Sequence, residues 1–338
     1  MELLINIIQK NIKKSTNPIK IIKNYYQPIN NEYLIYQSNF IKKELEIRLS
    51  HRINDLINLP YGLPLTSEIS KLTDSYFLSL EEVNKYHKIN DNDDIHNFTN
   101  LLLSIRNRHS NAEYLISHAI KKIKYIDLID NKKLNKHLDK FFLERIGVRT
   151  LIGQQVTSVN YNHSIIEKCN IKNIVNDSVS CIKGSTEYIY NSIPNISINI
   201  DPKIKILHIP SHIYYIVNEI TKNAVVSHFE NKIENKPIDI SAYETNKDLI
   251  IKVSDCGLGF PRKNINKLMS YYYSSNPRDI PYIPEKGVHI LSGYGVGLPL
   301  SKVYSRYLEG DIIINPVEGY GTDVYIYLDK TENAIENI

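Results

Sequence analysis

One stretch decides how this chain is interpreted: Gly293-Tyr294-Gly295-Val296-Gly297-Leu298-Pro299-Leu300-Ser301. It places three glycines at alternate positions and leads directly into a segment with a helical pattern. Glycine lets the backbone approach a ligand closely, and the free N–H groups at the start of a helix attract phosphate. The stretch favours a phosphate-binding loop, and a tight surface turn before a helix is the alternative.

The composition is that of a globular protein with room for two domains. The 338 residues are 42% hydrophobic and 23% charged, and their formal net charge is +4. No Lys/Arg block alternates with aromatic residues, so we do not expect nucleic acid as a partner. Cys169, Cys181 and Cys256 lack metal-ligand spacing, which fits a reducing compartment. No apolar run reaches the roughly 18 to 20 residues that span a bilayer, so no membrane insertion is expected.

Residues 1–30 carry five lysines against one acid, Glu2, with apolar residues at helical spacing. They are interpreted as either an amphipathic mitochondrial presequence or a basic first helix. Residues 31–162 show mostly helix-period patterns, and helices are predicted over 41–57, 66–87, 98–126 and 134–156, with a loop at 90–94. Four long helices joined by short loops predict an antiparallel bundle.

The first of these helices contains Leu49-Ser50-His51-Arg52, which is similar to the phosphoacceptor box of sensor histidine kinases. Arg52 stands where that box usually has an acid, and Pro60 comes later than its proline. The pattern therefore favours a helix-surface histidine at His51, with a phosphoacceptor as the alternative.

Residues 163–330 have a different pattern, and residues 331–338 form a short tail. A polar stretch through Asn162 and Asn173 predicts a domain boundary. Helices are predicted over 175–192 and 212–229, the second with Ser211 as its N-cap. Strand-like runs pair as two hairpins, 238–243 with 249–254 and 312–314 with 323–328. These elements predict an α+β sandwich in which helices cover one face of a mixed sheet.

Two groups of polar residues carry chemistry in this half. Glu219, Lys222 and Asn223 lie at i, i+3 and i+4 on the edge of an apolar helical stripe, where a carboxylate and an amide can hold Mg²⁺ or orient a nucleophile. Asp255 ends a strand and is followed by Gly257 and Gly259, so its carboxylate can accept an exocyclic amine such as adenine N6. The alternatives are a solvated helix edge and a plain Asp-x-Gly turn.

The order of the motifs resembles the GHKL ATP-binding superfamily: Glu-x-x-x-Asn, Asp-x-Gly-x-Gly, Gly-x-Gly-x-Gly and Gly319-Tyr320-Gly321-Thr322. Three further segments, 44–48, 106–111 and 142–149, together with 210–212 and 273–278, are similar to the mitochondrial α-keto-acid dehydrogenase kinases. Pyruvate dehydrogenase kinase matches best. The branched-chain keto-acid dehydrogenase kinase is the alternative, because 48–53 and 322–325 look closer to it.

The resemblance implies an α+β fold, with an N-terminal antiparallel four-helix bundle over 31–162 and a GHKL (Bergerat) ATP-binding domain over 163–330. It implies a protein-serine kinase of the mitochondrial matrix that uses ATP and Mg²⁺ to phosphorylate and inactivate the E1α subunit of the pyruvate dehydrogenase complex. A homodimer and docking on the lipoyl domain of the E2 core are also implied. The chain ends at Ile338 without the extended tail that pyruvate dehydrogenase kinases use in that docking.

The resemblance also assigns roles. Glu219 is the general base, Asn223 coordinates Mg²⁺, and Asp255, supported by Thr322, receives the adenine amine. Lys222 is expected to add charge near the phosphates, with a side chain that points to water as the alternative. The other expected nucleotide contacts are Gly257, Gly259, Ser274, Ser275, Gly293, Tyr294, Gly295, Val296, Gly297 and Leu298.

Two departures are Tyr215, where pyruvate dehydrogenase kinases usually place a histidine, and Val226, where the family commonly has arginine. Tyr215 also favours the branched-chain alternative. The two departures keep open an ATP-binding adaptor without phosphotransfer.

A regulatory keto-acid pocket in the bundle is implied as well, formed by Tyr76, Ser79, Arg106, His109, Arg145 and Arg149. Guanidinium groups beside a tyrosine hydroxyl suit a small carboxylate. Glu144 departs from the family pattern and adds a like charge, which is expected to weaken anion binding. Helix-surface ion pairing is the alternative for these residues.

Overall fold

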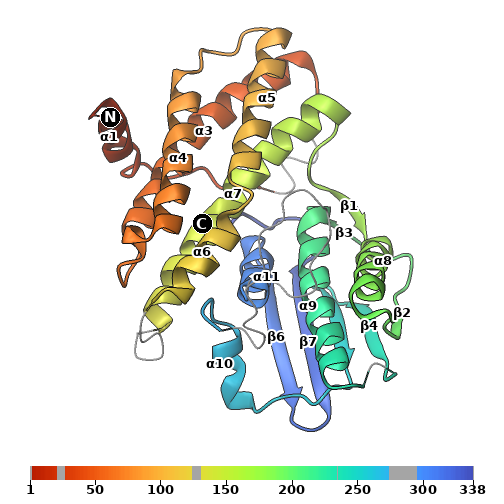
Figure 1. Cartoon of the computed structure of the whole chain (residues 1–338). Coiled ribbons are helices and arrows are strands. Elements are labelled where there is room, and N and C mark those ends of the chain that lie inside the picture. The colour runs from red at the N-terminus through yellow and green to blue at the C-terminus, as the bar shows by residue number, and fades with distance from the viewer. Residues whose placement is uncertain (1, 21–26, 124–130, 234, 274–294, 338) are drawn as a thin grey trace. The chain divides into compact units, whose positions relative to one another are not determined.

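The computed structural model describes residues 2–20, 27–123, 131–233, 235–273 and 295–337 (Figure 1). The chain divides into two compact units, residues 1–165 and residues 166–337. This division falls close to residues 162–163, where the change of sequence pattern predicts a boundary. Among the helices of the described residues, none is both long enough and apolar enough to cross a lipid bilayer.

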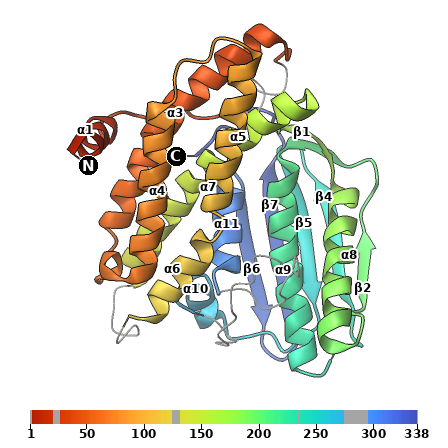
Figure 2. The same ribbon diagram turned by 45° about the horizontal axis from the view of Figure 1, so that its top comes forward.

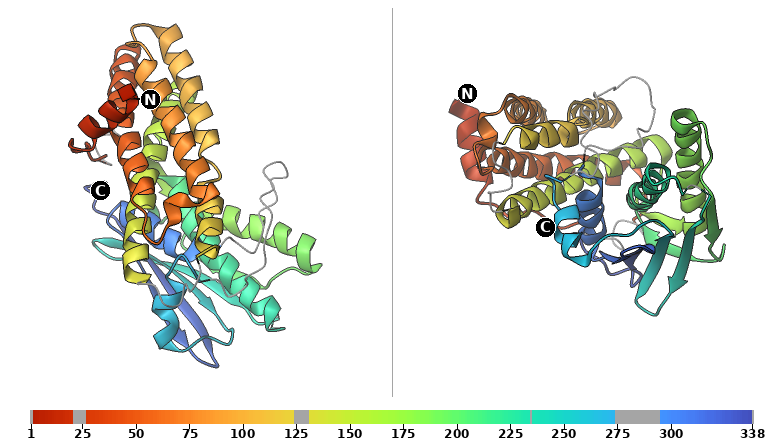
Figure 3. Two further views of the ribbon diagram at one scale, coloured as in Figure 1. Left: turned by 60° about the vertical axis from the view of Figure 1, so that its left-hand side comes forward. Right: turned by 60° about the horizontal axis from the view of Figure 1, so that its bottom comes forward.

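The first unit is helical. Its elements are α1 (Glu2–Asn11), α3 (Asn31–Ile57), the 3₁₀ turn η1 (Leu63–Leu65), α4 (Ser67–Lys85), α5 (Asn92–Arg108), α6 (Ala112–Lys121) and α7 (Asn131–Tyr161). Helix α3 packs against α4, α5 and α7, and the left-hand view of Figure 3 shows these long helices side by side. Fully buried leucines and isoleucines such as Leu45, Ile53 and Leu102 fill the space between them, and each contributes roughly 1.5–3 kcal/mol by leaving water.

The predicted helix over 98–126 is wrong, because the structure has two helices there. Helix α5 ends at Arg108, and α6 begins only at Ala112. The carbonyl oxygen of His109 accepts a hydrogen bond from Arg145 on α7 at 2.9 Å, and Ser110 N–H turns back to Asn107 O. A side chain from a distant helix therefore holds the backbone where the helical ladder stops.

The loop predicted at 90–94 is also wrong in part. Helix α5 already begins at Asn92, with Asp91 as its N-cap. The Asp91 side chain accepts a hydrogen bond from Asp94 N–H at 2.9 Å. The cluster of short polar residues therefore starts a helix instead of only separating two, which is the usual role of aspartate at an N-cap.

The N-terminal residues pack against the bundle. Asn11 at the end of α1 is buried, and its amide donates to Glu46 O at 3.1 Å and to Ser50 Oγ at 3.3 Å. Further along, Asn17 N–H donates to the Glu44 carboxylate at 3.0 Å. Helix α1 and the residues after it therefore pack on α3.

The second unit is an α+β sandwich, as predicted. Its strands are β1 (Glu167–Asn170), β2 (Ile196–Asn199), β3 (Lys205–His208), β4 (Ile238–Glu244), β5 (Asp248–Asp255), β6 (Asp311–Val317) and β7 (Gly321–Asp329). Its helices are α8 (Ile171–Tyr190), α9 (Pro210–Glu230), the 3₁₀ turn η3 (Arg262–Asn264), α10 (Ile265–Leu268) and α11 (Gly297–Tyr307).

Five strands form one mixed sheet in the order β2-β4-β5-β7-β6, in which only the β2–β4 pair is parallel. Both predicted hairpins, β4–β5 and β6–β7, are present. Helices α8, α9 and α11 lie on one face of the sheet (Figures 2 and 3). The register of β5 on β7 places Asp255 opposite Thr322, which brings two sequence motifs far apart in the chain to the same end of the sheet.

One local prediction is wrong here. Ser211 is not the N-cap of α9, because the helix begins at Pro210 and Ile209 precedes it as the cap. Proline is suited to this first position, since it has no N–H that would need a partner. The polar stretch predicted as a boundary contains the division between the two units, and within it strand β1 pairs with β3 in a separate two-stranded sheet.

Candidate active site

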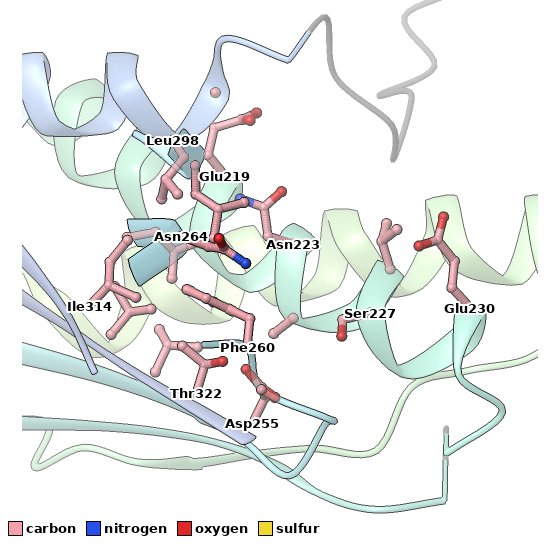
Figure 4. Close-up of a pocket in the computed structure, with 18 of the residues that line it drawn as sticks. Glu219, Asn223, Ser227, Glu230, Asp255, Phe260, Asn264, Leu298, Ile314 and Thr322 are labelled. Carbon is pink, nitrogen blue, oxygen red and sulfur yellow. The ribbon is translucent and has the colours of Figure 1, made fainter. Parts of the chain in front are cut away.

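A cavity of about 390 Å³ lies in the second unit between α9 and the sheet (Figure 4). Its walls come from α9, the end of β5 and the turn after it, the first residues of α11, and β6 and β7. The predicted residues that line it are Glu219, Asn223, Asp255, Gly259, Gly295, Gly297, Leu298 and Thr322. Three of the four sequence motifs and the threonine of the closing motif therefore meet around one space.

Helix α9 supplies one wall. Glu219 and Asn223 are one turn apart and both line the cavity, where the Asn223 amide is exposed. Lys222 is mostly buried and does not line the cavity, and its ammonium pairs with the Glu219 carboxylate. The structure thus places Lys222 as the partner of the candidate base.

The start of α11 lies against Glu219. A Cβ atom built on Gly297 would be 2.0 Å from Glu219 Oε2, so any larger residue at this position would force the carboxylate or the backbone of α11 to move. Gly295 has a φ of 82°, a left-handed conformation that glycine adopts without strain. Val296 between them is buried and does not line the cavity. Ser274, Ser275, Gly293 and Tyr294 lie outside the described residues.

Asp255 forms the opposite end of the cavity. Its Oδ1 accepts a hydrogen bond from Gly257 N–H at 2.8 Å, which fixes the carboxylate at the strand end. Burial raises the pKa of Asp255, although this hydrogen bond and the neighbouring His228 oppose the shift. The carboxylate thus has a hydrogen-bond donor beside it but little contact with water. Such an environment suits an acceptor for an N–H group of a ligand.

The glycines around Asp255 allow close packing of backbones. A Cβ on Gly259 would be 2.1 Å from Val317 O, and a Cβ on Gly321 would be 2.0 Å from Asp255 O. Gly259 and Gly321 also have positive φ angles of 56° and 140°. The Asp-x-Gly-x-Gly and Gly-x-Gly-Thr motifs therefore pack directly against each other at this end of the sheet.

Sequence reasoning missed part of the cavity. Ser227 and Glu230 continue the face of Glu219 and Asn223 along α9, and Phe260, Asn264 and Ile314 line the sheet side. The spacing of four residues from 219 to 223 to 227 is a signal that could have found Ser227. His228 was also missed: it is buried, and its Nε2 lies 3.9 Å from Asp255 Oδ1.

The two departures on α9 have different surroundings. Tyr215, one turn before Glu219, packs its ring on Tyr304 of α11 with the ring centroids 4.6 Å apart. Val226 lines the cavity beyond Asn223. Tyr215 thus links α9 to α11, and Val226 gives the cavity an apolar wall.

A second polar cluster is buried in the bundle. Tyr76 stacks on His109 with centroids 4.0 Å apart, Ser79 Oγ lies 3.0 Å from His109 Nε2, and Arg145 reaches the His109 carbonyl. Burial lowers the pKa of His109 to about 3, and the charges of Arg145 and Arg149 act in the same direction. Four of the predicted residues are thus in direct contact, and Arg149 acts on the group through its charge.

Arg106 has no recorded contact with this cluster among the described residues. Arg108 is there in its place: it donates to Ser79 Oγ at 2.8 Å and forms a two-pronged ion pair with Glu82 at 2.8 and 2.9 Å. Sequence reasoning did not single out Arg108. Because both arginines are in the last turn of α5, spacing alone could not choose between them.

The departure Glu144 pairs with the fully buried Arg52, and its carboxylate lies 3.7 Å from His51 Nδ1. Burial favours a higher pKa for Glu144, but the hydrogen bond with His51 and the Arg52 charge outweigh it and lower the pKa to about 2. Its negative charge is therefore matched by neighbouring cations. The other ring nitrogen of His51 lies 3.2 Å from Asn11 O, so both nitrogens face partners, which does not favour a phosphoacceptor.

Comparison with known proteins places both halves of the chain. Residues 20–183 match the family model of the mitochondrial branched-chain α-ketoacid dehydrogenase kinase, and residues 208–332 match that of histidine kinase-, DNA gyrase B- and HSP90-like ATPases. The human pyruvate dehydrogenase (acetyl-transferring) kinase isozyme 4 is 32% identical over 88% of this chain and 78% of its own length. The chain belongs to the pyruvate dehydrogenase kinase family.

Other relatives have the same name. The Arabidopsis thaliana pyruvate dehydrogenase kinase is 30% identical over 90% of this chain and 87% of its own length, and the Drosophila melanogaster one is 30% identical over 86% and 76%. This pyruvate dehydrogenase kinase family member is therefore a kinase with a GHKL-type ATP domain. The names of the relatives do not favour the branched-chain alternative, although the model that matches the helical half has that name.

Proposed function

We propose that the protein is a MgATP-dependent protein-serine kinase that phosphorylates, and so inactivates, the E1α subunit of the mitochondrial pyruvate dehydrogenase complex. The observation that carries the proposal is the cavity that Glu219, Asn223, Asp255 and the glycines of two motifs line together. The names of the relatives support the substrate complex.

The residues of the cavity fit a nucleotide. Asp255 offers a fixed acceptor to the adenine amine, and the glycine at 297 leaves room that a Cβ would fill beside Glu219. The Asn223 amide oxygen is the ligand we propose for Mg²⁺. When bound, ATP supplies the phosphoryl group and Mg²⁺ neutralises its charge. Glu219 receives the proton of the substrate hydroxyl, and Lys222 keeps that carboxylate in place by their ion pair.

The same relatives are named as mitochondrial proteins, which supports a mitochondrial location for this kinase. We place this protein in the mitochondrial matrix, as a homodimer that docks on the lipoyl domain of the E2 core. Location is tested by following the full chain in cell fractions with a matrix marker. Dimerisation is tested by the molecular mass in solution, and docking by retention on isolated lipoyl domain.

For the bundle we propose a regulatory pocket for a keto acid at Tyr76, His109 and Arg145. The buried Arg145 guanidinium beside the Tyr76 ring supports it, since such a pair suits a carboxylate. Arg145→Ala should leave basal kinase activity in place while removing inhibition by keto acids. An inhibition curve identical to that of the wild type would count against the pocket.

The experiment that tests the main proposal offers labelled ATP to the kinase with purified pyruvate and branched-chain E1 proteins side by side. We expect acid-stable phosphoserine on pyruvate E1α and loss of its activity. Label on the branched-chain E1 would assign the other complex. Acid-labile label on His51, absent from a His51→Gln variant, would instead show a histidine kinase.

A further inference from the structure

A buried histidine lies directly behind the carboxylate that we propose for adenine. His228 is 1% exposed on α9, with its Nε2 3.9 Å from Asp255 Oδ1. The turn after β5 packs against both residues. A Cβ on Gly257 would be 2.7 Å from Asp255 Oδ1 and 3.7 Å from His228 Cδ2, so the histidine, the carboxylate and the turn form one packed group.

The hydrogen bonds of His228 are incomplete. Its Nε2 has no hydrogen-bond partner among the described residues, although a buried polar atom normally has one. The backbone of Lys236 also favours the protonated form of the ring. A neutral imidazole has one N–H, so while that N–H is on Nδ1, Nε2 offers the carboxylate only a lone pair. A proton on Nε2 would turn this contact into an attraction.

Charged groups around His228 and Asp255 determine the protonation states of the two side chains before a ligand binds. Burial lowers the pKa of His228 and raises that of Asp255, while the attraction between the two opposes both shifts. The Lys236 ammonium opposes protonation of His228 and donates to Cys256 O at 3.4 Å, and Asp323 on β7 opposes ionisation of Asp255. Glu230 lines the same cavity further along α9. The neutral imidazole is therefore favoured at neutral pH.

We propose that His228 is a positioning residue for nucleotide recognition: when an adenine amine donates to Asp255, His228 takes up a proton on Nε2 and holds the carboxylate as a charged acceptor. The inference rests on the proposed ATP site. The amine stabilises the anion, and the bound base excludes water, so the carboxylate attracts an imidazolium more strongly. In this step one N–H bond forms at His228 Nε2 with a proton from solvent, and no other covalent bond changes.

The test is calorimetry of MgADP binding to the full chain, in buffers that differ in ionisation enthalpy, near neutral pH. The wild type should take up as much as about one proton more than His228→Gln. Protonation of the nucleotide phosphate is common to both proteins and cancels in the difference. The wild-type affinity should fall with rising pH, by at most about tenfold per pH unit, and that of His228→Gln should change less.

His208 on β3 provides a matched control. It is also buried, its Nε2 also lacks a partner among the described residues, and burial lowers its pKa to about 4, but, unlike His228, it is not paired with Asp255. His208→Gln should show the proton uptake of the wild type. Equal uptake by the wild type and His228→Gln overturns the inference. Failure of the wild type to bind MgADP at all would contradict the proposed function instead.

A second measurement uses no substitution. The ring-proton resonance of His228 in the wild-type protein is followed by NMR over a pH series, with and without MgADP. The inference requires the pKa of His228 to rise when MgADP binds. An unchanged or lower pKa would overturn it, whether or not His228→Gln folds.

Discussion

The two units use their polar groups in different ways. In the second unit, Glu219, Asn223 and Asp255 face a cavity and retain unused hydrogen-bonding capacity toward it. In the bundle, Glu144, Arg52 and His51 face one another, and their charges are largely matched within the protein. The difference indicates that a polar residue facing the cavity is available to bind a ligand. A charged residue that is paired with an opposite charge inside the bundle instead stabilises the fold. Substitutions should therefore affect binding in the first case and the free energy of unfolding in the second.

The largest expected effect is on Asn223. Asn223→Ala should lower MgATP-dependent activity by about a thousandfold or more, because a metal ligand and a contact near the phosphates are lost together. Its stability should change little, since the side chain is exposed. Calorimetry of MgADP binding and urea unfolding measure the two quantities. Asn246→Ala, an exposed asparagine in the β4–β5 turn, is the control. Unchanged nucleotide affinity in Asn223→Ala would contradict the assignment of this cavity as the nucleotide site.

Glu144 should show the opposite behaviour. Its pKa of about 2 in the fold lies below the ordinary 4.5, so its ionised form stabilises the fold fully above pH 4.5, and this contribution disappears as the pH falls toward 2. At neutral pH, Glu144→Gln should cost about 3 kcal/mol of unfolding free energy, and the difference from wild type should shrink in acid. Urea unfolding over a pH series measures it.

The matched control for Glu144 is Glu46→Gln, since Glu46 forms a partly exposed pair with Lys42 at 2.7 Å. A pair of this kind is worth about 0–1 kcal/mol. Equal destabilisation by the two substitutions would contradict the distinction between the buried cluster and a surface pair. Loss of nucleotide binding in Glu144→Gln, with the fold intact, would contradict the prediction that Glu144 affects only the free energy of unfolding.

Gly297 tests how closely α11 approaches the base. Gly297→Ala would place a methyl group 2.0 Å from Glu219 Oε2, so one of the two must move. We expect phosphoryl transfer to fall by about ten- to a hundredfold, since small misplacements at a reacting centre are costly. Gly184→Ala in α8 meets no atom within 4 Å and should be neutral or slightly stabilising. Full activity of Gly297→Ala would show that the contact is not used.

The smallest expected effect concerns Val226. Val226→Arg adds a cation to the cavity wall and should raise ATP affinity by about two- to fivefold at low salt, with the gain fading as salt is added. Val226→Gln is the uncharged control of similar size. An equal gain from glutamine, or a gain insensitive to salt, would show that charge is not the cause.

Much of the second unit can be predicted from the sequence, because its signals are local. Alternating apolar residues predict both hairpins, and glycines after Asp255 predict the turn that presents it. The β5–β7 register then joins Asp255 to Thr322 without any further signal being needed. The motifs therefore predict the cavity, although Ser274, Ser275, Gly293 and Tyr294 stay predictions.

The remaining features depend on contacts between distant residues. The helix break at His109 follows from a hydrogen bond with Arg145, and the state of Glu144 follows from Arg52 on another helix. His228 becomes important only because the turn after β5 closes over it. A sequence pattern gives only the spacing of residues along one element. It cannot show which charged side chain of a neighbouring helix will contact a given residue.

The most direct test of the central claim is a comparison of wild type and Glu219→Gln in two assays, MgADP affinity and transfer of phosphate from ATP to pyruvate E1α. The account predicts that Glu219→Gln keeps nucleotide affinity within about threefold while transfer falls by about a hundredfold or more, because the amide cannot receive the hydroxyl proton. Transfer at the wild-type rate by Glu219→Gln would contradict the assignment of the base. Nucleotide binding without transfer by the wild type would instead show an ATP-binding adaptor.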